Sequence, residues 1–157
     1  MTTTVPTVIL NNGVEMPMLG YDVLQTPPDE TEHCVAEALE VGYRLIDTAQ
    51  AYANEKGAGA AVAAAGVPRD EIFITSKIWV SNMNHERAAA SIDESLEKLG
   101  TDHIDLMLLH QAMSDYPGPT APWRRRTGPG SYAPSASRTS TPSASSTSPP
   151  WPRSHRR

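Results

Sequence analysis

The sequence predicts an α/β fold with a parallel sheet, because three apolar runs each end on an ionisable side chain and a helix-like stretch separates each run from the next. The runs end at Asp47, Lys77 and His110, which are 30 and 33 residues apart. That spacing suits one strand and one helix with their loops, and strands joined in this way are parallel neighbours. Their carboxyl ends then lie at one edge of the sheet, where catalytic groups gather in such folds.

A small hairpin is expected before the first of these runs. Residues 7–10 (TVIL) and 14–16 (VEM) flank Asn11-Asn12-Gly13. The Asn-Gly pair favours the positive φ angles of a tight turn between two antiparallel strands. Residues 18–21 (MLGY) would then form the first strand of the parallel sheet.

Three helices are expected between the strands. The first runs to about Val41, an alanine-rich second helix covers about residues 54–65, and Asn84 caps the third. A glycine in the left-handed conformation marks the expected end of each helix: Gly42, Gly66 and Gly100. The order is therefore a hairpin followed by β-α-β-α-β-α-β, which is half of an eight-stranded barrel or a small open sheet.

Composition divides the chain at about residue 116. Residues 1–116 carry 18 acidic and 6 basic side chains, whereas residues 117–157 carry 7 arginines and no acid. The second part has 9 Pro and 14 Ser or Thr but no Ile, Leu, Val, Met or Phe, so it cannot bury enough apolar surface to offset its ordering entropy. We expect one folded domain over residues 1–116 and a disordered tail over residues 117–157.

Cysteine usage and hydropathy indicate a cytoplasmic protein. The single cysteine, Cys34, has no partner for an internal disulfide, and no Cys/His spacing resembles a zinc site, so we expect no metal. Residues 1–6 lack the basic and apolar pattern of a signal peptide, and no apolar run approaches the ~20 residues that span a bilayer. We therefore expect no membrane partner.

Four side chains near the expected strand ends could carry out chemistry together: Asp47, Tyr52, Lys77 and His110. A tyrosine with a pKa of about 10 acts as a general acid near neutral pH only where positive charge stabilises its phenolate. Lys77 would supply that charge, and Asp47 would hold the ammonium by a salt bridge. His110 would orient or polarise a carbonyl oxygen, so that the group delivers a proton to a carbonyl that receives hydride from a reduced nicotinamide.

Each of these four residues also has a purely structural interpretation. Asp47 could cap the following turn, and Lys77 could be a solvated strand end. Tyr52 could be a packing aromatic and His110 a hydrogen-bonded core residue. The four together favour the catalytic interpretation, because polar strand ends taken singly are common.

Four segments resemble the aldo-keto reductases. Residues 42–55 (GYRLIDTAQAYANE) are the most specific, and residues 75–79 (TSKIW) and 108–111 (LLHQ) follow the same pattern. Residues 10–17 (LNNGVEMP) are similar to the family's hairpin. The subgroup that the chain resembles is the bacterial reductases of keto-sugars and small aldehydes or ketones, and the resemblance covers roughly residues 5–116.

The resemblance implies a (β/α)8 TIM barrel, of which this chain would hold the N-terminal hairpin and the first four βα strands. It implies an NADPH-dependent oxidoreductase that reduces a small aldehyde or ketone to an alcohol. Tyr52 would be the general acid, Asp47 and Lys77 would tune it and belong to the cofactor site, and His110 would orient the substrate carbonyl. Three further residues fall where the family lines its substrate pocket: Trp79, Leu24 and Ala49.

One matching position has an alternative interpretation, and another position departs from the family's pattern. Trp79 could be an ordinary buried aromatic, because large aromatic side chains serve both uses. Asp22 departs from the family's pattern, which usually has glycine at this position beside the nicotinamide. A carboxylate near the cofactor could disturb its binding.

The resemblance stops at about Tyr116. The family would continue with a fifth helix, four more strands, and the Ser-Asn, Gln and Lys/Arg motifs that hold the nicotinamide and the adenosine 2′-phosphate. None of these follows in residues 117–157, whose composition is typical of a GC-rich coding sequence read out of frame. Shifted by one base, the codons of residues 132–148 permit a peptide with Ser-Asn-Phe that resembles the family's fifth-strand segment. Our hypothesis is a truncated reductase joined to a frameshifted tail.

Two other functions remain open. The arginines of residues 124–126 and 153–157 could neutralise nucleic-acid phosphates, but the absence of base-reading elements and the acidic body argue against a nucleic-acid partner. A non-catalytic α/β fragment could self-associate, because four strands of a barrel leave two open edges. For the same reason we expect weak or absent turnover from the chain as it stands.

Overall fold

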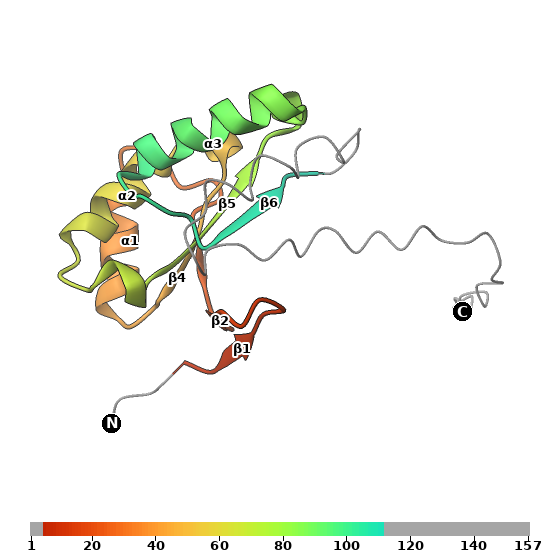
Figure 1. The fold of residues 1–157 in the computed structure, drawn as a ribbon. Helices are drawn as coiled ribbons and strands as arrows, with labels where there is room; N and C mark the ends of the chain where they lie inside the picture. Colours follow the sequence, from red (N-terminus) through yellow and green to blue (C-terminus); the bar gives the residue numbers. More distant parts are fainter. Residues whose placement is uncertain (1–4, 112–157) are drawn as a thin grey trace, which may run out of the picture.

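The computed structural model describes residues 5–111 (Figure 1). The strands are β1 (Thr7–Ile9), β2 (Glu15–Pro17), β3 (Tyr21–Asp22), β4 (Leu45–Asp47), β5 (Phe73–Ile78) and β6 (Leu106–Leu109). The helices are α1 (Thr31–Glu40), α2 (Glu55–Ala64) and α3 (His85–Leu99), with short 3₁₀ turns η1 (Gln50–Tyr52), η2 (Arg69–Glu71) and η3 (Val80–Asn82). The expected disordered tail, residues 117–157, lies outside the described residues.

The sheet has the predicted parallel topology. Its strand order is β3-β4-β5-β6, and each neighbouring pair is parallel. The register sets Asp22 opposite Asp47 and Lys77 opposite Leu108. Strands β1 and β2 form the expected antiparallel hairpin. The alternation of strand and helix thus brings the carboxyl ends of all four strands of the sheet to one edge.

Side chains alternate between the two faces of the sheet and fill two separate cores. On one face the three helices, which lie together on one side in Figure 1, pack over Ile46, Ile74 and Met107. On the other face, hairpin side chains such as Met16 pack on a smaller cluster that includes Leu45. Residues two apart on a strand share a face, so Asp47 lies on the same face as Leu45. We call this face, which is opposite the helices, the inner face. By the same alternation Lys77 and His110 also lie on the inner face.

The predicted helix ends are confirmed. The Asn84 side chain accepts a hydrogen bond from the Arg87 N–H at 2.8 Å, which satisfies one free donor at the start of α3. Gly100 follows this helix with a φ of +63°, a conformation that glycine adopts without strain. Gly59 allows close packing, because a Cβ there would lie 2.2 Å from the Leu99 carbonyl oxygen. Among residues 5–111, no helix is long and apolar enough to traverse a bilayer.

The first strand of the sheet is shorter and starts later than predicted. We expected it over residues 18–21, whereas β3 comprises only Tyr21–Asp22. The Met18 N–H donates to the Pro6 carbonyl at 2.8 Å, so the beginning of the predicted strand instead extends the hairpin. Strand β5 lies one residue later than the predicted run from Ile72 to Lys77, because it begins at Phe73 and continues to Ile78.

Candidate active site

Asp47, Tyr52, Lys77 and His110 come together at the carboxyl ends of β4, β5 and β6. The Lys77 Nζ donates to the Asp47 Oδ1 at 2.7 Å and to the Tyr52 hydroxyl at 3.2 Å. The rings of Tyr52 and His110 meet edge to face, with centroids 5.7 Å apart. The four predicted groups therefore form one cluster, which we call the mouth cluster.

Tyr52 is positioned by the short turn η1, which follows β4. Its N–H donates to the Ala49 carbonyl at 3.0 Å, and Ala53 comes next with a φ of +58°. Residues with a Cβ seldom adopt this left-handed conformation, so the surrounding contacts must stabilise the turn against its cost. It holds the phenol over the sheet, with the Lys77 Nζ 4.8 Å from the centre of the ring.

The ion pair of Lys77 and Asp47 is largely shielded from solvent, with side chains 14% and 26% exposed. Burial acts to lower the pKa of Lys77, but the hydrogen bonds to Asp47 and Tyr52 outweigh it and raise that pKa above its ordinary value. Burial raises the pKa of Asp47, Lys77 opposes this, and the neighbouring Asp22 carboxylate adds to it. Lys77 is therefore a firmly charged ammonium at neutral pH.

His110 contributes a neutral imidazole to the mouth cluster. Burial lowers its pKa, and the Lys77 ammonium lowers it further, while the Asp47 and Asp22 carboxylates act in the opposite direction. Its backbone N–H donates to the Ile78 carbonyl at 2.9 Å, which continues the ladder between β5 and β6. Its Nδ1 is buried and has no hydrogen-bond partner among residues 5–111. A neutral imidazole presents one donor and one acceptor, so this ring can bind an incoming polar atom.

The three predicted pocket residues occupy different environments. The Trp79 ring lies edge to face with the His110 ring, at a centroid distance of 5.2 Å, and so borders the mouth cluster. Leu24 is 56% exposed just after β3, whereas Ala49 is fully buried between β4 and η1. A role for the three in binding a substrate stays a prediction.

Gln50 positions the segment after β5, a role that the sequence analysis missed. Its Oε1 accepts from the Trp79 N–H at 3.0 Å, and its Nε2 donates to the Ser91 carbonyl at 3.0 Å and to the Ser95 Oγ at 3.2 Å. One amide thus connects the turn that carries Tyr52 to helix α3 and to the backbone of Trp79. The hydrogen-bond partners of Gln50 are distant in the sequence, so local patterns could not predict this role. The only signal in the sequence is a set of polar side chains within residues 48–55.

Asn54 connects the segments that follow β3 and β4. This buried side chain donates to the carbonyls of Val23 and Thr26 at 2.9 and 3.2 Å, and its Oδ1 accepts from the Thr48 hydroxyl at 3.0 Å. A buried amide with three hydrogen bonds fixes its neighbours, because losing one partner costs about 1–3 kcal/mol. Asn54 therefore holds the backbone after β3 against the backbone that leads to Tyr52.

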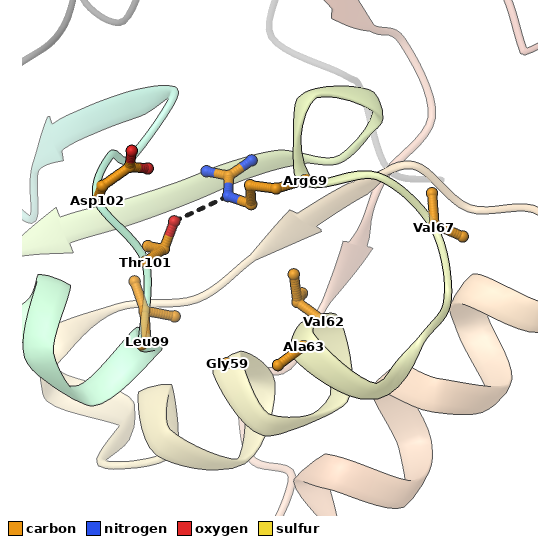
Figure 2. A pocket seen from close by; sticks show the side chains of 9 residues that line it. Gly59, Val62, Ala63, Val67, Arg69, Leu99, Thr101 and Asp102 are labelled. Atoms are coloured by element: carbon orange, nitrogen blue, oxygen red, sulfur yellow. Dashed lines mark hydrogen bonds between the residues drawn. The ribbon is translucent and has the colours of Figure 1, made fainter.

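A cavity of about 390 Å³ lies at the opposite end of the sheet, just before β5 and β6 (Figure 2). Its lining comprises Gly59, Val62, Ala63, Val67, Arg69, Leu99, Gly100, Thr101 and Asp102. The Arg69 guanidinium donates to the Thr101 hydroxyl, the Ile72 and His103 carbonyls and the Asp105 carboxylate. This cavity is separate from the mouth cluster, and its one cation is committed to hydrogen bonds within the fold.

A comparison of the whole sequence with known families shows which family the chain belongs to. The model described as the Aldo/keto reductase family matches residues 16–134. The chain belongs to the aldo-keto reductase family. Residues 5–111 correspond to the hairpin and the first four strands of the (β/α)8 barrel. The family match runs past residue 116, where we placed the end of the resemblance.

Individual aldo-keto reductases are similar over the same region. One from Mycolicibacterium smegmatis is 47% identical over 105 residues, which are 67% of this chain and 38% of that protein. The crystal structure of an aldo/keto reductase from Brucella melitensis is 49% identical with a TM-score of 0.71, over 73% of this chain and 44% of that chain. A Bombyx mori aldo-keto reductase in complex with NADP is 35% identical with a TM-score of 0.65, over 69% of this chain and 39% of that chain. The chain thus spans about two fifths of the length of the curated relatives it matches.

Proposed function

We propose that this chain carries the proton-donating part of an NADPH-dependent aldo-keto reductase site, which reduces a small aldehyde or ketone to an alcohol. The observation that carries the proposal is the 3.2 Å hydrogen bond between the Lys77 Nζ and the Tyr52 hydroxyl, with Asp47 2.7 Å from the same ammonium. Family membership supports the reaction class, and the NADP complex of the Bombyx mori relative supports the cofactor.

Tyr52 gives its phenolic proton to the carbonyl oxygen of the substrate. The Lys77 ammonium donates a hydrogen bond to the phenol oxygen and stabilises the negative charge that remains there. Asp47 keeps the ammonium in place through its own hydrogen bond. The cluster thus lowers the cost of forming the phenolate without a change in geometry during the reaction.

His110 orients the substrate carbonyl. Because burial lowers its pKa, the imidazole is neutral at pH 7 and donates a hydrogen bond to the carbonyl oxygen without adding a second positive charge. The Trp79 ring packs edge to face on this imidazole and restricts its rotation. Gln50 holds the Trp79 backbone, so the turn that carries Tyr52 also aligns the orienting residue.

NADPH, when bound, supplies the hydride. Asp47 and Lys77 are the residues of this chain that would hold it, because a partly exposed carboxylate and ammonium can bond to the hydroxyl and amide groups of a nicotinamide nucleotide. The buried His110 Nδ1, which lacks a partner among residues 5–111, also fits a polar ligand at this edge of the sheet.

We further infer that turnover is impaired in this chain because residues 117–157 are read out of frame. Strands β3 and β6 each pair with one strand only among the described residues, and such open edges also favour self-association. Sequencing the codons from Asp115 to Arg157 tests the frameshift. A reductase segment in another frame is the expected result, and codons that spell no reductase in any frame would overturn the inference.

Isotope transfer tests the reaction even where turnover is slow. The purified 157-residue chain is incubated with acetophenone and NADPH deuterated at the transferable position, and the alcohol is analysed by mass spectrometry. We expect deuterated 1-phenylethanol from the wild-type chain and about 10³-fold less from Tyr52→Phe. Tyr43→Phe is the matched control, because Tyr43 precedes β4 at the opposite end and contacts Tyr21. No deuterated alcohol from the wild type would overturn the activity, and equal amounts from Tyr52→Phe would overturn the role of Tyr52.

A further inference from the structure

Asp22 stands beside the mouth cluster, and the proposed mechanism gives it no role. It lies directly opposite Asp47 in the parallel register of β3 and β4. Side chains at paired positions of neighbouring strands project from the same face, so Asp22 shares the inner face with Asp47. The Asp22 Oδ1 accepts a hydrogen bond from the Leu24 N–H at 2.7 Å, which fixes the exposed carboxylate at this edge.

The Asp22 carboxylate acts on two members of the mouth cluster. Burial is the largest cause of the raised pKa of Asp47; Lys77 acts to lower that pKa, and the neighbouring Asp22 side chain acts to raise it. The Asp22 carboxylate also works against the burial that lowers the pKa of His110. Its negative charge therefore reaches the place where the substrate carbonyl is proposed to bind.

The mouth cluster and Asp22 together carry a net charge. Lys77 is paired with Asp47, and the imidazole of His110 is neutral at pH 7 because of its lowered pKa. Asp22 has no cation within salt-bridge distance among residues 5–111. The described part of the mouth therefore carries one net negative charge, which resides on Asp22.

We propose that Asp22 determines which substrates the site accepts by their charge. It disfavours carbonyl compounds that carry a carboxylate or phosphate and favours neutral and cationic ones. The inference rests on the proposed function, because it assumes that a carbonyl compound binds between Tyr52 and His110. At an effective dielectric constant between those of a protein surface and of water, one unit charge beside the site changes the binding of a charged ligand roughly tenfold.

Binding of two matched ketones to the full chain tests this proposal. Acetophenone is neutral, and 4-acetylbenzoate has the same skeleton with one carboxylate. Dissociation constants are measured by NMR from the ring signals of His110 in the wild type, Asp22→Asn and Asp70→Asn. Asparagine keeps an oxygen acceptor for the Leu24 N–H and removes only the charge. Asp70→Asn removes the same charge from an exposed site in η2, at the other end of the sheet.

We expect 4-acetylbenzoate to gain about tenfold in affinity relative to acetophenone in Asp22→Asn, and no change in this ratio in Asp70→Asn. The pKa of His110, measured from the same signals, should fall in Asp22→Asn because a charge that raises it is lost. An unchanged ratio, an unchanged pKa, or no binding of either ketone to any of the chains would overturn the proposal. These measurements need no turnover, so a changed ratio without deuterated product would overturn the proposed function and support the charge specificity.

Discussion

Two ion pairs lie at opposite ends of the same sheet, and their surroundings differ. Arg69 and Asp105 meet at 2.8 Å just before β5 and β6, and Lys77 and Asp47 meet at 2.7 Å at the mouth. The side chains of both pairs are similarly shielded, at 20% and 17% exposed for the first and 14% and 26% for the second. Distance and burial therefore do not distinguish the Arg69–Asp105 pair from the pair proposed to act in catalysis.

The neighbouring hydrogen bonds distinguish the two pairs. The partners of Arg69 belong to the fold, and Asp105 also accepts from the Ile74 N–H at 2.8 Å. At the mouth, Lys77 donates to the Thr48 carbonyl and also to the Tyr52 phenol, and the buried Nδ1 of His110 lacks a partner among residues 5–111. An unpaired buried polar atom costs about 1–3 kcal/mol, so the mouth gives up stability that the other end keeps. We infer that the Arg69 pair serves folding, whereas the Lys77 pair serves chemistry.

Replacing Lys77 should have the largest effect, and it should be an effect on catalysis. Lys77→Met removes the ammonium that stabilises the Tyr52 phenolate, so we expect deuterated alcohol to form about 10³-fold more slowly, which is about 4 kcal/mol in the barrier. The free energy of unfolding should fall by only about 1 kcal/mol, because Lys77 bonds a single backbone carbonyl among the described residues, that of Thr48. Product analysis and urea unfolding measure the two effects.

Lys56→Met serves as the control for Lys77→Met. Lys56 is exposed on α2, so this variant removes one lysine without touching the mouth. It should match the wild type in both measurements. A Lys77→Met chain that loses as much free energy of unfolding as is expected for Arg69→Met would contradict the distinction between the two ion pairs. So would a Lys77→Met chain that forms product at the wild-type rate.

Replacing Arg69 should produce the opposite pattern. Arg69→Met leaves the Asp105 carboxylate without the guanidinium and removes one of the two hydrogen bonds to the His103 carbonyl, so we expect a loss of about 3 kcal/mol in the free energy of unfolding. Product formed per folded chain should stay the same. Arg87→Met, which removes an exposed arginine from α3, is the matched control. A loss below about 1 kcal/mol, the range of a surface pair, would contradict the structural assignment.

Local signals in the sequence predicted most of the architecture. Apolar runs that end on Asp47, Lys77 and His110 gave the parallel strands, because strand periodicity and helix length are both short-range properties. Asn84 and the glycine at 100 gave the ends of α3 for the same reason, since capping involves residues within one turn. The topology predicted that Asp47, Lys77 and His110 would lie at one edge, and the need of a phenol for a nearby cation predicted that Tyr52 would join them.

Contacts between distant segments could not be predicted in the same way. Met18 pairs with Pro6 rather than with β4, so the local pattern of residues 18–21 misplaced the first strand of the sheet. Gln50 and Arg69 find most of their partners about 30 to 45 residues away, and no spacing in the sequence marks them. The sequence shows that Asp22 departs from the family's pattern. Its position opposite Asp47 depends on the register of β3 and β4, which only the structure gives.

The smallest expected effect is a dependence of the free energy of unfolding on pH that arises from the titration of His110. Burial and Lys77 lower the pKa of His110 in the folded chain from its ordinary 6.5, so the folded state resists protonation. The stability that this contributes is fully present above about pH 6.5 and is lost as the pH falls through the lowered pKa.

Urea unfolding of the wild type and His110→Asn measures this dependence. Between about pH 7 and about pH 5 the wild type should lose more stability than the variant, by less than about 1 kcal/mol. The raised pKa of Asp47 acts in the opposite direction, because the folded chain binds that proton more readily, but it is present in both chains and its effect largely cancels. Equal losses would mean that His110 is protonated as easily in the folded chain as in the unfolded one. The assignment of a neutral imidazole to His110 would then be wrong. The proposed difference between the two ends of the sheet would lose part of its support.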